Sequence, residues 1–283
     1  MTRFHYRCPI RWGDLDAQGH VNNAVVVDYL QEARVEFLLS SAVADLLGAG
    51  VVVVAHQVEY LAPIPFAPGP DGPAVDIELW IDQVGAARFC LSYELRHRDT
   101  LVGRARTVVT PYDLAEQRVH RLTDTERDVL RAAVEPPVEL RALPSGRPGA
   151  DAFTWPCRVR WADLDSYGHV NNVKFYDYFQ EARIAWFGDA WDPALTVLLV
   201  RQDVDYVRPV DFRREPYTVR LAPLVAGRTS LTVGAELVDK PGSGHPPTVF
   251  ARARSVLVCA GPDLQPVEIP DALRARLGVA PGQ

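Results

Sequence analysis

The sequence has little that would tie the chain to a membrane, a nucleic acid or a disulfide framework. No run of about 18 apolar residues occurs, so no transmembrane helix is expected. Acidic residues outnumber basic ones, 36 to 30, and a net charge of −6 argues against a nucleic-acid-binding surface. The N-terminal residues lack the apolar stretch of a signal peptide, and no C-x-x-C motif signals zinc or redox chemistry. We therefore expect a reduced, cytoplasmic protein, in which Cys8 and Cys157 behave as small hydrophobes.

What the sequence does contain is one segment that occurs twice. Residues Arg11–Arg34 return 149 positions later as Arg160–Arg183, and 16 of the 24 positions are identical. The period is too long for a solenoid, whose repeats run about 20–50 residues, so each copy is a whole domain. The shared residues include Asp, His, Asn and Gly, whereas a core would keep Leu and Val. This pattern indicates a duplicated functional site.

Each copy has the same order of predicted elements: a strand, a loop, one long helix and four more strands. Apolar residues at helical spacing predict helices from Val26 to Phe37 and from Phe175 to Trp186. Hairpin turns are expected at Gly85 and Gly227. The predicted strands are Phe4–Trp12, Val51–Leu61, Ala74–Val84, Arg88–Arg98 and Val102–Tyr112 in the first copy, and Thr154–Trp161, Thr196–Val207, Tyr217–Val225, Ser230–Val238 and Thr248–Cys259 in the second.

Sequential strands joined by tight turns predict an antiparallel sheet, and the helix must bury its apolar stripe against that sheet. The domain boundaries follow from this order, with a first domain at residues 1–118 and a second at 153–283. Residues 119–152 form the linker, which holds a short helix at Asp124–Val134 capped by Thr123 and then an extended, exposed crossing. A similar short helix is expected at Pro270–Gly278.

The element order and the D-x-D-x-x-G-H-V-N-N loop resemble the hotdog fold of the 4-hydroxybenzoyl-CoA thioesterase-like family, and acyl-carrier-protein thioesterases carry a related string. The resemblance covers both halves outside the linker. It implies an α+β fold of two tandem hotdog domains, each an antiparallel sheet of about five strands wrapped around one long helix, paired as an intramolecular pseudo-dimer. It also implies a thioesterase that hydrolyses an acyl-CoA or acyl-carrier-protein thioester to free acid and thiol. Neither a cofactor nor a metal is expected.

The resemblance places the catalytic carboxylate at Asp16 and Asp165, and the oxyanion-binding backbone N–H at Asn23 and Asn172. A carboxylate can attack a thioester carbonyl or activate a water molecule for that attack. The first N–H groups of a helix have no intrahelical partner and carry a partial positive charge, which suits them to hold an oxyanion. These residue types therefore match the needs of thioester hydrolysis.

Two further residues are shared by the loops. Gly19 and Gly168 permit backbone conformations, or a close approach of substrate, that a side chain would block. His20 and His169 have two open interpretations: they orient the neighbouring aspartate or a water molecule, or they brace the loop.

The flanking pairs are interpreted as structural. Asp14 and Asp163 are predicted to accept hydrogen bonds from loop N–H groups, and Trp12 and Trp161 are predicted to be core or lining residues. A calcium loop that starts at Asp14 would need Glu at position twelve, where the chain has valine, so no metal is predicted.

Helix residues offer a second set of charges. Glu32 and Glu181, with Asp28 and Asp177, are alternative catalytic acids on the helices. Glu32 falls well off the apolar stripe, so a solvated face is the default interpretation. Arg34 and Arg183 are predicted to form structural ion pairs, and Asn22 and Asn171 to cap the helices.

Arg208 and Arg228 are candidates to bind CoA phosphates, and both are absent from the equivalent positions of the first copy. Ordinary solvated charges are the alternative for each arginine. If they do bind phosphate, the two sites differ in affinity or substrate.

Three functions stay open. The first is the thioesterase, the second is a non-catalytic acyl-thioester binder or sensor, and the third is a hydratase or dehydratase of the same fold. The sequence shows no added DNA-binding segment, which argues against a regulator. It also shows no strand histidine paired with a distant acid in both copies, which argues against a hydratase. The sequence does not determine the acyl length or the choice between CoA and carrier protein. It also leaves open whether the aspartate acts as nucleophile or general base, whether both sites are active, and whether the protein forms a further homo-oligomer.

Overall fold

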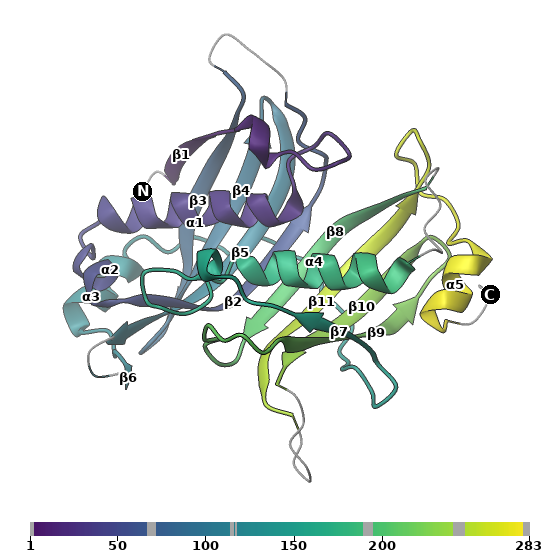
Figure 1. Ribbon diagram of the computed structural model, residues 1–283. Helices are drawn as coiled ribbons and strands as arrows, with labels where there is room; N and C mark the ends of the chain where they lie inside the picture. Colours follow the sequence, from purple (N-terminus) through teal and green to yellow (C-terminus); the bar gives the residue numbers. More distant parts are fainter. Residues whose placement is uncertain are drawn as a thin grey trace. The chain divides into compact units, whose positions relative to one another are not determined.

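The computed structural model describes residues 3–66, 72–113, 116, 118–188, 195–239 and 247–279, and the chain divides into two compact units. Unit 1 spans Met1–Arg141 and unit 2 spans Ala142–Gln283. Within each unit, one long helix lies across the face of an antiparallel sheet, α1 in unit 1 and α4 in unit 2 (Figure 1). The predicted order of strand, helix and four strands is confirmed in both units.

Unit 1 arranges its sheet in the order β1-β3-β4-β5-β2, with every neighbouring pair antiparallel, and β6 pairs with β5. Its elements are β1 (Phe4–Pro9), the 3₁₀ helix η1 (Trp12–Asp14), α1 (Asn23–Leu39), α2 (Asp45–Ala49), β2 (Val51–Tyr60), β3 (Ala74–Val84), β4 (Phe89–His97), β5 (Thr100–Asp113), β6 (Arg118–Val119) and α3 (Asp124–Arg131).

Unit 2 repeats this arrangement in the order β7-β9-β10-β11-β8, again antiparallel throughout. Its elements are β7 (Phe153–Cys157), the 3₁₀ helix η2 (Trp161–Asp163), α4 (Lys174–Phe187), β8 (Thr196–Tyr206), β9 (Tyr217–Ala226), β10 (Ser230–Val238), β11 (Val249–Ala260) and α5 (Asp271–Leu277). The order of the strands is therefore the same in the two copies, as the sequence repeat requires.

The core of each unit lies between the long helix and the sheet. The stripe predicted on each helix is buried except at Phe37, which is half-buried. Leu30 and Ala33 are inaccessible in unit 1, and Phe179 and Ala182 are inaccessible in unit 2. Burial of one large apolar side chain stabilises a fold by about 1.5–3 kcal/mol, so these stripes fix each helix on its sheet. No helix in the described ranges is both long enough and apolar enough to cross a bilayer.

The first strand of each unit ends earlier than predicted. β1 stops at Pro9 and β7 at Cys157, and a turn of 3₁₀ helix begins at Trp12 and at Trp161. The reason is local, because the aspartate that closes each turn accepts a hydrogen bond from the backbone N–H three residues earlier. The extended strand is thereby converted into a turn before the loop begins.

The hairpin predictions are confirmed. The N–H of Gly85 donates to the carbonyl of Arg88, and the N–H of Gly227 donates to that of Ser230, each at 2.8 Å. The short helix capped by Thr123 is also present, and it ends at Arg131, three residues before the predicted end.

One strand irregularity occurs at the same place in both units. The pairing of β3 with β4 skips Asp82, and the pairing of β9 with β10 skips Leu224, so each residue sits in a β-bulge. In unit 1 the buried Asp82 carboxylate accepts two hydrogen bonds from Arg106, at 2.6 and 2.8 Å, and one from Ser92 at 2.6 Å. In unit 2 the leucine packs so closely on Gly234 that a Cβ there would lie 3.0 Å from its methyl carbon. The same β-bulge is thus stabilised by polar contacts in unit 1 and by apolar packing in unit 2.

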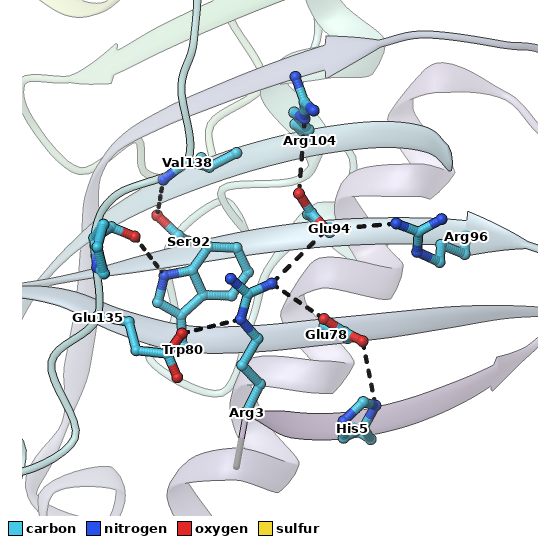
Figure 2. Close-up of polar contacts among 11 residues, drawn as sticks. Arg3, His5, Glu78, Trp80, Ser92, Glu94, Arg96, Arg104, Glu135 and Val138 are labelled. Atoms are coloured by element: carbon cyan, nitrogen blue, oxygen red, sulfur yellow. Dashed lines mark hydrogen bonds and ion pairs between the residues drawn. The ribbon is translucent and has the colours of Figure 1, made fainter. Parts of the chain in front are cut away.

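The linker is mostly exposed, as predicted, but hydrogen bonds anchor it to the sheet of unit 1. On β3 the Trp80 indole N–H donates to the carbonyl of Pro136 at 2.9 Å. On β4 the Ser92 hydroxyl accepts from the Val138 N–H at 3.0 Å. Arg3 lies over the Trp80 ring at 3.8 Å and bonds to Glu135 at 3.1 Å, as Figure 2 shows. The first half of the linker is therefore part of the packed structure of unit 1.

Candidate active site

A buried aspartate organises the loop in each unit. The Asp14 carboxylate accepts hydrogen bonds from the Arg11 backbone N–H at 2.8 Å and from the Tyr29 hydroxyl of α1 at 2.5 Å. Asp163 repeats both bonds, and its bond from the Tyr178 hydroxyl is 2.7 Å long. Burial and the bond to Asp14 raise the pKa of Tyr29 well above its ordinary value, so this hydroxyl keeps its proton and donates it. The predicted structural role of Asp14 and Asp163 as acceptors of loop N–H groups is confirmed.

The loop that follows is a short hairpin. Leu15 pairs with Val21 in unit 1, and Leu164 pairs with Val170 in unit 2. At the tip, Gly19 has φ +78° and Gly168 has φ +80°. A Cβ at either glycine would meet no atom within 4 Å, so glycine is required there by the backbone conformation rather than by a close neighbour.

The second aspartate of each loop has one oxygen engaged and one oxygen open. Oδ1 of Asp16 accepts from the Gln18 N–H at 2.8 Å, and Oδ1 of Asp165 accepts from the Tyr167 N–H at 2.9 Å. Both side chains are half-buried. The Oδ2 atom of each carboxylate makes no hydrogen bond with any residue that the structure describes. The turn therefore fixes the carboxylate while it leaves one oxygen able to meet a ligand.

The start of α1 leaves one backbone donor open. The Asn22 N–H donates to the carbonyl of Asp14 at 2.8 Å, and the Asn22 side chain accepts from the Ala24 N–H at 2.9 Å, which confirms the predicted cap. The Asn23 carbonyl accepts from the Tyr60 hydroxyl at 3.0 Å. Across residues 22–24, the Asn23 N–H is the backbone donor with no partner in the described part of the chain. It lies at the positive end of a helix of 17 residues.

Unit 2 has the same contacts but a different helix start. The Asn171 N–H donates to the carbonyl of Asp163 at 2.9 Å, and its side chain accepts from the Val173 N–H at 3.0 Å. The Asn172 carbonyl accepts from the Tyr206 hydroxyl at 2.9 Å. However, α4 begins only at Lys174, so Asn171 caps the turn before the helix and Asn172 lies within that turn.

The histidines differ between the two loops. His169 Nε2 lies 3.5 Å from the Asp211 carboxylate. Unit 1 has Pro65 at the position equivalent to Asp211, and its backbone forms a β-bridge with that of His20. Neither imidazole bonds to the neighbouring Asp16 or Asp165 among the described contacts. The backbone does brace the loop, since the His20 carbonyl accepts from the Asp16 N–H at 2.8 Å and the bond in unit 2 is 2.9 Å.

The prediction that Trp12 and Trp161 could be core residues is wrong. Their exposed fractions are 75% and 74%. The 3₁₀ turn directs each indole outward, where it meets one phenylalanine edge to face at 5.4 Å, Phe66 in unit 1 and Phe212 in unit 2. Both copies therefore keep an aromatic pair on the surface beside the loop.

Within unit 2 the two candidate phosphate-binding arginines lie far apart. The Arg208 N–H bonds to the carbonyl of Phe250 near the start of β11, whereas the hairpin of Arg228 bonds to Cys259 near its end. Phe250 and Cys259 are nine steps apart along β11, which corresponds to about 30 Å. The loop of unit 2 joins the sheet at the Arg208 end, and Arg228 pairs with Glu268 at 3.0 Å. The structure thus places only Arg208 at the loop end of its unit.

The arginines of the helices are buried against the sheets. Arg34 donates to the Tyr93 hydroxyl at 3.4 Å and forms no ion pair with any described residue, so the predicted ion pair is wrong there. Arg183 donates to Gln202 at 3.0 Å and to Ser255 at 3.3 Å, which are neutral side chains. The strands behind each helix are therefore polar at this level of the core.

The alternative helix acids do not face the interior. Glu32 and Glu181 are both exposed, which confirms the solvated-face interpretation. Asp28 and Asp177 are half-buried, and each lies near a cation, Arg11 at 3.7 Å and Lys174 at 3.3 Å. The loop aspartates are half-buried and form no ion pair with a described residue.

Sequence reasoning missed the tyrosines that end β2 and β8. Tyr60 and Tyr206 bond to the two Asn-Asn segments in the same way, although they lie 34 to 37 residues further along the chain. A signal was present, because the aligned strand ends share Val, Tyr and Pro at matching positions.

Comparisons with known proteins agree with this architecture. The profile of the Thioesterase-like superfamily matches the chain over residues 10–142 and 159–277. An acyl-ACP thioesterase from Bacteroides thetaiotaomicron is 14% identical over 90% of this chain and 97% of its own, with a TM-score of 0.66. The 12:0-ACP thioesterase from Umbellularia californica is 17% identical over 90% of this chain and 94% of its own, with a TM-score of 0.71. A search of curated proteins finds no match. The predicted fold of two tandem hotdog domains is confirmed.

Proposed function

Because this chain belongs to the thioesterase-like superfamily, we propose that it hydrolyses an acyl thioester carried on coenzyme A or on an acyl carrier protein. The observation that carries the proposal is the open pair of groups in the loop of unit 1. One is the Oδ2 atom of Asp16 and the other is the Asn23 N–H, and neither has a partner among the described residues. Their neighbours along the loop are bonded, so these two groups are left to meet a substrate.

The chemistry needs one group that delivers a nucleophile and one that stabilises the negative charge on the carbonyl oxygen. As a general base, Asp16 takes a proton from a water molecule whose oxygen attacks the thioester carbon. As a nucleophile, its Oδ2 attacks that carbon directly and forms an anhydride, which water then hydrolyses. In both cases the C–S bond breaks, the thiolate leaves and is protonated, and the acid is released. The same roles fall to Asp165 in unit 2.

The oxyanion would be held by the N–H of Asn23 in unit 1 and of Asn172 in unit 2. Its charge develops at the positive end of a helix, where the dipole favours it. Loss of one such donor in a hydrolase typically costs about 3–4 kcal/mol of transition-state stabilisation. The likeness to acyl-ACP thioesterases supports a carrier-protein thioester as one substrate class to test first.

The test is thiol release from panels of acyl-CoA and acyl-carrier-protein thioesters. The variants are Asp16→Asn, Asp165→Asn and the double variant. Asparagine keeps the Oδ1 acceptor that forms the turn with Gln18 or Tyr167, so the loop geometry is retained while the charge is lost. We expect the double variant to lose at least about 100-fold in kcat, the lower range for a positioned base.

A matched control is Asp263→Asn, because Asp263 accepts from the Gln265 N–H in the same kind of turn outside the candidate site. Its rates should equal those of the wild type. Equal rates in the wild type and the double variant would overturn the assignment of Asp16 and Asp165. Tight binding of thioesters without thiol release by the wild type would instead favour the non-catalytic binder.

A further inference from the structure

A hydrogen bond from the sheet to the helix start is repeated in both units. The Tyr60 hydroxyl donates to the Asn23 carbonyl at 3.0 Å, and the Tyr206 hydroxyl donates to the Asn172 carbonyl at 2.9 Å. Both tyrosines are the last residues of their strands, β2 and β8. We propose that Tyr60 and Tyr206 are positioning residues, which hold the peptide next to the candidate oxyanion donor; this inference rests on the proposed function.

The bond from tyrosine completes a clamp on a single peptide group. In unit 1 the peptide between Asn23 and Ala24 has its carbonyl held by Tyr60 and its N–H held by the side chain of Asn22 at 2.9 Å. The preceding donor, the Asn22 N–H, is fixed on the carbonyl of Asp14 at 2.8 Å. The Asn23 N–H lies between these fixed groups, so its direction cannot change unless one of the bonds breaks. Preorganised donors of this kind stabilise an oxyanion without reorganisation during the reaction.

The clamp in unit 2 holds the peptide between Asn172 and Val173 in the same way. Tyr206 binds the carbonyl, and the side chain of Asn171 binds the N–H at 3.0 Å. The difference is that α4 starts at Lys174, so this peptide lies outside the regular helix. In unit 1 the helix itself already includes Asn23 and supports the carbonyl. We therefore expect loss of the tyrosine hydroxyl to affect unit 2 more than unit 1.

The substitution Tyr→Phe separates positioning from packing. The Tyr206 ring contacts Phe175 of α4 edge to face at 5.1 Å, and phenylalanine preserves that contact. Only the hydroxyl is removed, so the carbonyl loses one acceptor bond while the ring continues to fill its place. An ordinary hydrogen bond corresponds to a factor of about five in an equilibrium or rate.

The composition of the chain provides a direct probe. Its four asparagines are Asn22, Asn23, Asn171 and Asn172, so protein labelled with ¹⁵N only at asparagine reports on these four backbone amides. The ligand is a ketone analogue of acyl-CoA in which CH₂ replaces the thioester sulfur, since it keeps the carbonyl oxygen but cannot be hydrolysed. Saturation with the analogue should shift the Asn23 and Asn172 amide protons downfield.

In Tyr60→Phe the shift of Asn23 should shrink, and in Tyr206→Phe the shift of Asn172 should shrink by a larger fraction. The kinetic expectation for the double variant is a fall in kcat of about fivefold or more, with KM unchanged within twofold, because the bond acts on the oxyanion donor. The matched control is Tyr217→Phe, which loses a hydroxyl bond to a backbone carbonyl, that of Asp211, at 3.0 Å. It should change neither the amide shifts of Asn23 and Asn172 nor kcat.

The outcomes separate this inference from the proposed function. Thiol release with unaltered kcat and amide shifts in the double Tyr→Phe variant would overturn positioning and leave the hydrolase intact. Amide shifts that depend on the tyrosines, in a wild type that releases no thiol, would support positioning and overturn hydrolysis. No response of Asn23 and Asn172 to the analogue in the wild type would overturn positioning whatever the activity.

Discussion

A buried histidine in unit 1 predicts a pH dependence that the second unit lacks. His56 on β2 has no exposed surface and pairs with Thr107 of β5. Burial, with a smaller contribution from the charge of Arg34, lowers the pKa of His56 well below its ordinary value. The equivalent strand pair in unit 2 is Gln202 with Ser255, so the second copy holds a neutral amide at this position. His56→Gln is therefore a substitution that this fold already accommodates.

The sign follows from the protons bound in each state. Well above a pH of about 6.5 the imidazole is neutral in both states and adds no pH dependence. Below that, the unfolded chain binds a proton that the folded chain does not, so the free energy of unfolding falls as the pH falls. With the buried imidazole neutral throughout, protonation of the unfolded chain between pH 7.5 and pH 5.5 lowers the free energy of unfolding by about 1.4 kcal/mol, which corresponds to a few degrees in Tm.

The assay is urea unfolding of the wild type and of His56→Gln at pH 7.5, 6.5 and 5.5. Carboxylates elsewhere titrate in both proteins, so the quantity of interest is the difference between the two pH profiles. We expect the wild type to lose about 1.4 kcal/mol more than the variant over this range. Parallel profiles would show that folded His56 takes up its proton in this range, and the reasoning from burial would then be wrong.

Three further predictions concern the loop, the thiols and the surface. Gly168→Ala should lower the free energy of unfolding by about 1–2 kcal/mol, because residue 168 has a positive φ. The control Gly13→Ala should be neutral, since the second repeat carries alanine at the equivalent position. Equal effects of the two substitutions in a urea titration would contradict this. The four cysteines are buried, and burial raises the pKa of Cys157 to about 12, so fewer than one thiol should react with a disulfide reagent at pH 8 until urea exposes all four. Acrylamide should quench the fluorescence of Trp12 and Trp161 strongly, and replacing both by Phe should remove the most accessible fraction; an unchanged quenching curve would place the indoles elsewhere.

The architecture could be predicted from the sequence because the duplication repeats each local pattern in both halves. The helix stripes, the glycine turns and the capped helix after Thr123 depend on local periodicity and on turn chemistry, which neighbouring residues determine. The loop aspartates could be divided into two kinds for the same reason. Asp14 closes a turn with a residue three positions away, and Asp16 closes a tighter one with Gln18, so both contacts are local.

The features that were missed depend on contacts between distant segments. Trp12 has an apolar side chain, and only the 3₁₀ turn that follows β1 shows that it points to solvent. The bond between Tyr60 and Asn23 joins residues 37 positions apart, so no local pattern indicates it. Arg34 was expected to find an acid, but the strand opposite presents a tyrosine hydroxyl.

The bulge shared by β3 and β9 has a consequence for how the two repeats can change. Arg106 pairs with Asp82 across the bulge, whereas Arg254, at the matching place on β11, lies 3.6 Å from Asp203 of β8 on its other side. In unit 1 the acid therefore lies on β3, two strands from the arginine, whereas in unit 2 it lies on β8, the adjacent strand on the other side. In unit 1, replacing Arg106 alone leaves the buried Asp82 carboxylate without its cation, at a cost of about 3–5 kcal/mol. In unit 2, Asp203 also pairs with the buried Arg201 at 2.6 Å, so it keeps a cation when Arg254 is replaced. The two halves therefore share the bulge but balance the charges around it differently, and a single exchange of these residues is unfavourable in unit 1.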